Sequence, residues 1–471
     1  MKKILLNSLA LAMCVITQQS FAMTALDDDA LSAVDAQALL NLENAYDSSQ
    51  GINFHKLSVE ALMELNVNIK TLQLGCGGTN NSIGNKNGCD IDISNLALSG
   101  LNTSLDVKGN PVFSGDRANT SASINNPFIE FAIKNGGSAS TREVVGFRLG
   151  ADKIVGLLTM GTDNVENPND GLKSFSGYMK MAQTTGESVT KAGTFGNASD
   201  QKIQGNLKAL GQTREFISKP GAEGHTGITV PSMRVDFTMP ETIVTGQRLK
   251  SATVTNIRSS ITSIPLAAPI SGATLPNDVI GTPNFSNDKL YVEFDPLIDF
   301  LNLGTHSFFQ MGAGSSLDNL NMDITFVQAL NMIHNIPLNG TGGYLSLQSQ
   351  NVHWQGADAA DIAKPGWWMS FKDPVQLGVL KTTDEVDISF VLPQVATAIS
   401  EFLLRPENLI NVNVGEAVGS LANVPVVRKL NIDVGQFTNY NGGTPATLTL
   451  MDKLLQNQNV TSNCFGGHKF C

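Results

Sequence analysis

Short runs of alternating apolar and polar residues recur along most of the chain. Because successive side chains of a strand point to opposite faces, each run predicts a half-buried antiparallel strand. The runs lie at 129–133, 145–149, 233–237, 290–294, 386–390 and 430–434. Gly, Asn, Asp and Pro clusters, such as those at 167–171 and 338–343, predict the turns between them. We therefore predict a mainly β protein with an elongated or multi-sheet antiparallel architecture, either sandwich-like or irregular and solenoid-like.

Helical spacing is confined to a few segments near the ends of the chain. Apolar residues fall near helical spacing at 24–43 and 54–65, and a helix is also predicted at 395–404, where Gly and Pro are absent. A last helical piece is expected at 447–456. We divide the chain into an N-terminal helical segment (23–66), a β-rich region (67–260) and a second β-rich region (261–471) with short helices and a terminal cysteine loop.

The first 22 residues resemble a cleaved export signal. Lys2 and Lys3 precede an apolar stretch from Ile4 to Val15, and Ser20-Phe21-Ala22 forms a small-x-small cleavage site. Met13 precedes Cys14 where a lipoprotein signal requires a small residue, which favours cleavage over lipid anchoring. The expected location is the periplasm or the cell surface.

Composition narrows the classes of partner. The formal net charge is −11 and only 15 % of residues are charged. Without a basic stripe to neutralise phosphates, nucleic acid is not an expected partner. No apolar stretch beyond the signal is long enough for a membrane-spanning helix, so we do not expect an integral membrane protein.

The later cysteines predict disulfides in an oxidising compartment. Proximity in sequence favours Cys76–Cys89, which closes a Gly- and Asn-rich loop, and Cys464–Cys471, which closes a loop at the chain end. Zinc is the less favoured alternative, because paired C-x-x-C motifs are missing and only His468 lies near a cysteine.

Motifs for chemistry are scarce. The chain has no G-x-S-x-G, H-E-x-x-H or Walker motif, and its histidines are not spaced as metal ligands. We predict a protein that is not an enzyme and has no catalytic residues, cofactor or metal site. The acidic stretch 163–171 leaves calcium as an open alternative to an exposed turn; its oxygen-bearing residues are Asp163, Glu166, Asn167, Asn169 and Asp170.

Three tryptophans are concentrated at Trp354, Trp367 and Trp368. If 367–371 is a strand, Trp367 and Trp368 point to opposite faces, and one buried face cannot hide both rings. Either both are buried in a two-layer β core, or one contributes to a binding site or an interface.

Residues 23–40 (MTALDDDALSAVDAQALL) contain an L-D-D-x-x-L-S-x-V run, and residues 89–102 read CDIDISNLALSGLN. In these features the chain resembles the FilA-type pilus-system proteins of gammaproteobacteria, whose post-signal run is followed by Gly-Gln-Asp-Gly where this chain has Asp35-Ala36-Gln37-Ala38. The resemblance implies a surface or pilus-associated role. Because 24–43 is predicted as helix, no alternating donor strand is visible, which favours a large accessory or tip component over an ordinary pilin.

The leading hypothesis is thus a noncatalytic exported structural or adhesive component of a pilus-like or cell-surface system. Its partners would be other pilus-system or envelope proteins, or a host or abiotic surface. The alternative is a periplasmic binding or carrier protein that holds an apolar or glycan ligand between β layers. Candidate lining residues for that ligand are Phe308, Phe309, Trp367 and Trp368.

Overall fold

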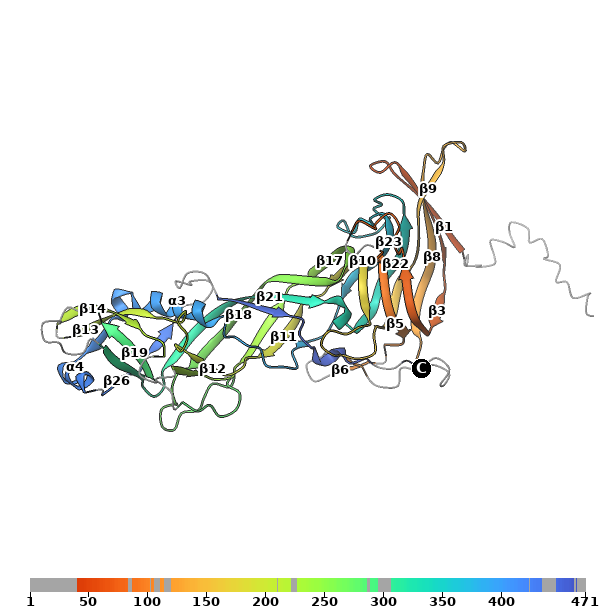
Figure 1. Cartoon of the computed structure of the whole chain (residues 1–471). Helices are drawn as coiled ribbons and strands as arrows, with labels where there is room; N and C mark the ends of the chain where they lie inside the picture. The colour runs from red at the N-terminus through yellow and green to blue at the C-terminus, as the bar shows by residue number, and fades with distance from the viewer. Residues whose placement is uncertain are drawn as a thin grey trace, which may run out of the picture.

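Strands account for 56 % and helices for 7 % of the structure, a computed structural model, which confirms the mainly β prediction. The structure describes residues 40–83, 87–101, 103–105, 111–113, 120–209, 211–221, 227–285, 289–294, 306–422, 424–433, 446–460 and 463. The molecule is elongated, with a broad end that carries the first strands and a narrow end that carries the helices (Figure 1).

The broad end is built on one 11-stranded sheet. Its main path runs in the order β1 (Leu40–Asp47), β2 (Ile52–Val59), β8 (Ala122–Lys134), β9 (Glu143–Thr159), β22 (Asn335–Gln348), β23 (Gly366–Val375), β10 (Leu172–Met181), β5 (Ile91–Ser99) and β4 (Val67–Leu74). In addition, β3 (Leu62–Leu65) pairs with β8, and β17 (Thr242–Leu249) pairs with β10.

This sheet curls back on itself. The end of β9 also pairs with β5, where Ala97 lies opposite Thr159, so β9, β22, β23, β10 and β5 close into a ring. Strands β8, β2 and β1 continue outward from β9 on the side away from β22. We call β1, β2, β8 and the first half of β9 the wing.

The narrow end consists mainly of two further sheets, which are joined to the broad end by long strands (Figure 1). The six-stranded sheet has the order β25 (Ile410–Val412), β13 (Gln204–Ala209), β14 (Gln212–Ser218), β19 (Lys289–Phe294), β20 (His306–Met311) and β26 (Val426–Arg428). The four-stranded sheet contains β18 (Ser251–Pro265), β21 (Ser316–Ala329), β27 (Asn431–Asp433) and β28 (Ala446–Met451).

Smaller elements complete the described chain. They are a three-stranded sheet of β16 (Arg234–Met239), β11 (Thr184–Val189) and β24 (Leu380–Lys381), and the pairs β12 (Gly193–Phe195) with β15 (Ile228–Val230) and β6 (Thr103–Leu105) with β7 (Pro111–Phe113). The 3-10 turns are η4 (Leu330–Met332), η5 (Pro406–Asn408) and η6 (Gln456–Gln458).

The described residues contain two α-helices, α3 (Leu392–Leu403) and α4 (Val414–Leu421). Helix α3 confirms the helix predicted at 395–404, because Val395, Ile399 and Leu403 fall on one buried face. Helix α4 begins with a reciprocal cap. The Glu416 N–H donates to Asn413 Oδ1 at 2.9 Å, and the Asn413 N–H donates to Glu416 Oε2 at 2.9 Å.

Three other local predictions are wrong. Residues 54–65, predicted as helix, form most of β2 and all of β3. Of residues 447–456, also predicted as helix, 447–451 belong to β28 and 452–455 connect it to η6. In each case apolar residues spaced for a short helix also fit a strand, and pairing with β8 or β21 decides the outcome. Of the run 386–390, predicted as a strand, only Val386 makes a bridge, and the rest leads into α3.

Two further expectations bear on the start and division of the chain. Of the helix predicted at 24–43, residues 40–43 belong to β1 and residues 24–39 lie outside the described residues. The predicted divisions after residues 66 and 260 do not separate the sheets. The 11-stranded sheet takes strands from all three ranges, and residue 260 lies within β18.

The apolar core forms two clusters. The larger runs through the ring and the narrow end, from β5 and β10 to β18, β21, β28 and α3. The smaller lies on one face of the broad sheet and includes Phe54, Tyr178, Trp354 and Trp368. Segment 349–365 supplies Trp354 and covers this face.

Candidate functional site

Two of the three tryptophans, Trp367 and Trp368, belong to β23, and Trp354 packs on one face of the sheet with Trp368. As predicted, Trp367 and Trp368 point to opposite sides: Trp367 packs against the larger core cluster, while Trp368 belongs to the smaller one. Trp354 is fully buried, Trp368 is 1 % exposed, and Trp367 is partly buried, with its ring meeting Phe147 edge-on at 6.1 Å. The rings of Trp354 and Trp368, two of the candidate binding or interface residues, are therefore covered by protein.

A buried cluster of hydrogen-bonded polar side chains, which the sequence does not predict, joins segment 349–365 to the sheet. The buried Asp361 carboxylate accepts hydrogen bonds from Trp368 Nε1 at 2.9 Å, from the Tyr344 hydroxyl at 2.6 Å and from Ser370 Oγ at 2.5 Å. Burial and the neighbouring Asp361 charge raise the pKa of Tyr344 well above its usual value, so its hydroxyl remains a donor. These bonds hold segment 349–365 on the sheet.

Arg148 is the second buried charge at this place. It forms an ion pair with Glu130, and its guanidinium lies 4.9–5.2 Å from the ring centres of Phe128, Tyr344 and Trp354. Burial raises the pKa of Glu130, while the Arg148 charge opposes that shift.

A pocket opens beside Arg148, with a volume of about 210 Å³. Its walls include Lys56, Phe128, Tyr344, Asp361 and Lys372. Ligand pockets usually have volumes of roughly 300–1,000 Å³, so this one is small for a ligand. Lys56 Nζ lies 4.7 Å and Arg148 Cζ 5.2 Å from the centre of the Phe128 ring. These two cations leave little of that ring free to stack on a sugar.

Hydrogen bonds join the disulfide loop to the beginning of β23. The predicted Cys76–Cys89 bond is confirmed. Asp90, which follows it, accepts hydrogen bonds from Arg248 Nε at 3.0 Å, Asn80 Nδ2 at 2.9 Å and the Trp367 N–H at 3.0 Å. Through Asp90, this network fixes the disulfide loop to β17 and β23. Cys464 and Cys471 lie outside the described residues.

The acidic stretch 163–171 is an exposed turn over most of its length. Asp163, Glu166, Asn167 and Asn169 are exposed, whereas Asp170 accepts hydrogen bonds from Thr162 Oγ1 at 2.8 Å and from Asn95 Nδ2 at 3.0 Å. Within the described part of the chain, no group of three or more His, Cys, Asp or Glu side chains is arranged to hold a metal ion.

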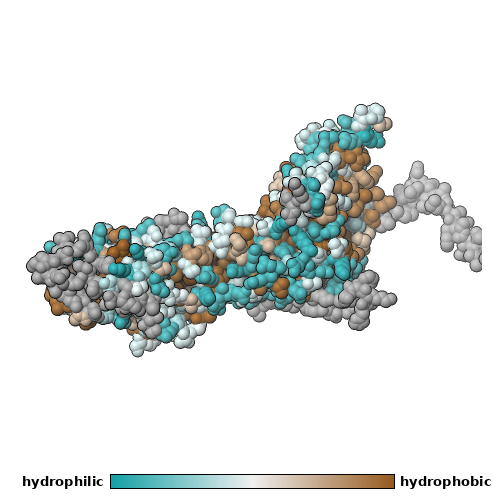
Figure 2. Space-filling model, in the orientation of Figure 1, coloured by the Kyte–Doolittle hydropathy of each residue, from teal (hydrophilic) through white to brown (hydrophobic). Residues whose placement is uncertain are grey.

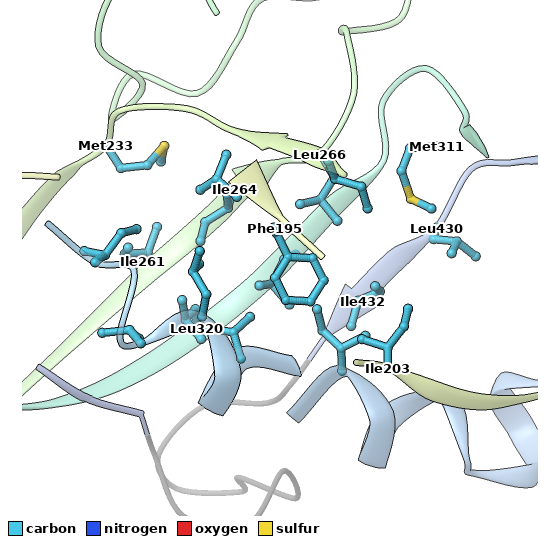
Figure 3. A pocket seen from close by; sticks show the side chains of 18 of the residues that line it. Phe195, Ile203, Met233, Ile261, Ile264, Leu266, Met311, Leu320, Leu430 and Ile432 are labelled. Carbon is cyan, nitrogen blue, oxygen red and sulfur yellow. The ribbon is translucent and has the colours of Figure 1, made fainter. Parts of the chain in front are cut away.

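An enclosed cavity lies in the narrow end, between the strands and α3 (Figure 3). Figure 3 shows Phe195, Ile264 and Ile432 converging on it, and its lining is almost entirely apolar. The free volume is about 50 Å³, far below that of a typical ligand pocket. The candidate carrier residues Phe309, Trp367 and Trp368 do not line it, and the side chain of Phe308 lies outside the described residues.

One face of the wing, opposite segment 349–365, exposes apolar side chains; we call it the wing face. The strand registers align one apolar side chain from each strand, because residues directly opposite in a pair share a face. This row crosses the wing and continues into the ring as Leu42, Leu57, Ile129, Leu149, Leu345 and Met369.

The outer part of this row is open to solvent. Leu42 is 67 % exposed, Leu57 38 % and Leu149 48 %, and the adjacent Tyr46 and Phe131 are also exposed. Figure 2 shows apolar surface gathered over this part of the broad end. Contiguous apolar surface of this kind marks interaction sites in soluble proteins. Alternation at 40–46 and 129–133 indicates two strands of this face, but the first run overlaps the helix predicted at 24–43.

Comparison with protein-family models, curated protein sequences and solved structures finds no match to this chain. None of the helices in the described ranges has the length and apolar character needed to span a membrane.

Proposed function

We propose that this protein is a noncatalytic structural or adhesive component of an exported, pilus-like or other cell-surface assembly, and that the wing is its contact surface. The observation that carries the proposal is the apolar row on the wing face, whose outer part exposes Leu42, Leu57 and Leu149. Burying one such side chain fully stabilises a contact by about 1.5–3 kcal/mol, so a row of them favours association with another surface.

The apolar cavity in the narrow end does not support a carrier role for an apolar ligand. The enclosed cavity is too small for a lipid or glycan, and the side chains that close it pack against one another as an apolar core. The elongated shape and the clamped disulfide loop suit a mechanical component outside the cytoplasm, where disulfides persist.

The proposal is tested by locating the protein in the cell and by asking whether that location changes when the wing face is altered. Immunogold labelling of intact cells and of sheared appendages should detect the wild-type chain at the surface. The variant Leu42→Glu should shift the protein to the free periplasmic fraction, because a charge interrupts the apolar row.

Val418→Glu is the matched control. Val418 is 60 % exposed, but it lies on α4 at the narrow end, so this substitution should leave the location unchanged. Recovery of the wild-type protein only as a free periplasmic monomer would contradict the proposal.

A further inference from the structure

Strand β1 is the outer margin of the broad sheet. In the described residues it pairs only with β2, so the hydrogen-bonding groups along its other edge have no strand partner there. Proteins commonly protect such edges with Pro, Lys or a bulge, because an open edge is a template for another strand. The sequence LNLENAYD contains neither Pro nor Lys, and its pairing with β2 is regular over all eight residues.

The two acidic residues of β1 already have local partners. Glu43 accepts a hydrogen bond from Asn41 Nδ2 at 2.9 Å and lies 3.7 Å from Lys56 Nζ. Asp47 accepts hydrogen bonds from Ser49 and Gln50 in the turn to β2, and these bonds lower its pKa to about 2. Neither carboxylate therefore has to be neutralised by an incoming strand.

We infer that a second copy of this chain pairs its own β1 with this edge, antiparallel and about a two-fold axis at Asn44. A two-fold axis perpendicular to the sheet keeps both wing faces on the same side and places one residue opposite itself. The choice of that central residue fixes the whole register.

Charge and strand length select Asn44 among the central positions of β1. An axis at Glu43 places Glu43 opposite its own copy, and an axis at Ala45 places Glu43 opposite Asp47, so both oppose like charges. An axis at Leu42 pairs only residues 40–44 of β1 with one another. The axis at Asn44 pairs residues 41–47 and sets Glu43 opposite Ala45.

On the wing face, the same register sets Leu42 of one copy opposite Tyr46 of the other. These are among the most exposed apolar side chains of the wing, at 67 % and 65 %, and the pairing brings them into contact. Aromatic and aliphatic cross-strand pairs stabilise a sheet by roughly 0.2–1 kcal/mol each. The two wings then form one continuous sheet with one continuous apolar face. This inference rests on the proposed function, because it takes the wing as the contact surface and names its first neighbour.

Site-directed thiol cross-linking of the purified chain from Met23 onward tests the register. With Asn44→Cys, the two introduced thiols face one another across the axis, at the roughly 4.5–5.5 Å Cβ separation of opposed residues, which is close to disulfide geometry. Diamide should therefore convert this variant to a covalent dimer, doubling its mass on a nonreducing gel.

Asn41→Cys is the matched control, with the same strand and the same native cysteines. In this register its two thiols lie six positions apart along the strand, roughly 20 Å, and should not cross-link. Light scattering after size exclusion should show a dimer for the wild-type chain and a monomer for Leu42→Glu.

Equal cross-linking of Asn44→Cys and Asn41→Cys, or a monomeric wild-type chain, would overturn the inference. A chain that dimerises only after removal of residues 23–39 would assign the edge to that preceding segment and would also overturn it. Surface labelling separates this inference from the proposed function: a monomer found at the cell surface refutes only the pairing, and a dimer found only in the periplasm refutes the surface role.

Discussion

The Glu130–Arg148 pair provides a quantitative test of how the covered face of the wing is held together. Glu130 is 1 % and Arg148 5 % exposed, so Glu130→Leu would leave a guanidinium buried without its counter-charge. Removing one partner of a buried ion pair costs about 3–5 kcal/mol. Arg148 cannot easily escape to water, because it also donates to the Gln355 carbonyl at 2.7 Å and lies over three aromatic rings.

Replacing both members should cost less than replacing Glu130 alone. In Glu130→Leu combined with Arg148→Met, neither member of the pair is left buried without its partner, and the apolar side chains keep much of the packing with Phe128 and Trp354. The raised pKa of Glu130 supports this expectation, since it shows that burial already disfavours the carboxylate.

Urea unfolding followed by tryptophan fluorescence is the appropriate assay, because the Trp354 ring lies 5.1 Å from the Arg148 guanidinium. Small proteins have urea m-values of up to about 3 kcal/mol/M and larger chains have larger values, so Glu130→Leu should lower the midpoint by at most roughly 1–2 M. Arg258→Met is the control: Arg258 is 68 % exposed and 3.9 Å from Asp323, so its loss should cost no more than about 1 kcal/mol. The reasoning fails if Glu130→Leu behaves like this control, or if the double variant is less stable than Glu130→Leu.

Three further outcomes are expected. Replacing Cys76 and Cys89 together by Ser should lower the free energy of unfolding by about 3 kcal/mol, measured by urea unfolding, because the reduced loop gains entropy in the unfolded chain; an unchanged midpoint would contradict this. Hydrogen bonds from Arg428 and the Asn413 N–H lower the pKa of Glu416 from 4.5 to about 2. Its stabilising effect is therefore complete above about pH 4.5 and is lost as pH falls towards 2, so the midpoints of wild type and Glu416→Gln should converge over that range; a constant difference would argue against the interaction. Val230→Ile adds one methylene to the wall of the enclosed cavity and should raise the free energy of unfolding by about 0.8 kcal/mol, whereas a loss would show that the cavity cannot admit it.

The strands were predictable wherever alternation was long and bounded by turn residues. The run 129–133 lies in the second half of β8, and 145–149 lies in β9, because alternation fits a strand with one more buried and one less buried face. Short apolar runs were ambiguous. Residues 54–65 and 447–456 fit a helical face in isolation, and only pairing with strands far along the chain made them β.

The alternating runs indicate single strands, but the sequence does not predict that these strands align into the wing face. Leu42 and Leu57 looked like members of two helices, and their alignment with Ile129 and Leu149 exists only in the strand registers. The opposite orientation of Trp367 and Trp368 followed directly from strand geometry. The cover over Trp368 did not, since it comes from a segment without alternation.

The position of β9 between β8 and β22 sets an order on folding. Figure 1 shows the early strands β8 and β9 beside the much later β22 and β23. Asn335 pairs with Thr159 and Gln348 with Gly146, so the ring closes only across a very long loop. Because a chain is synthesised from its N-terminus, β8 and β9 emerge long before β22, which pairs with β9, and before segment 349–365, which covers the sheet. We therefore expect the nascent broad end to need protection from aggregation until nearly four-fifths of the chain has been delivered.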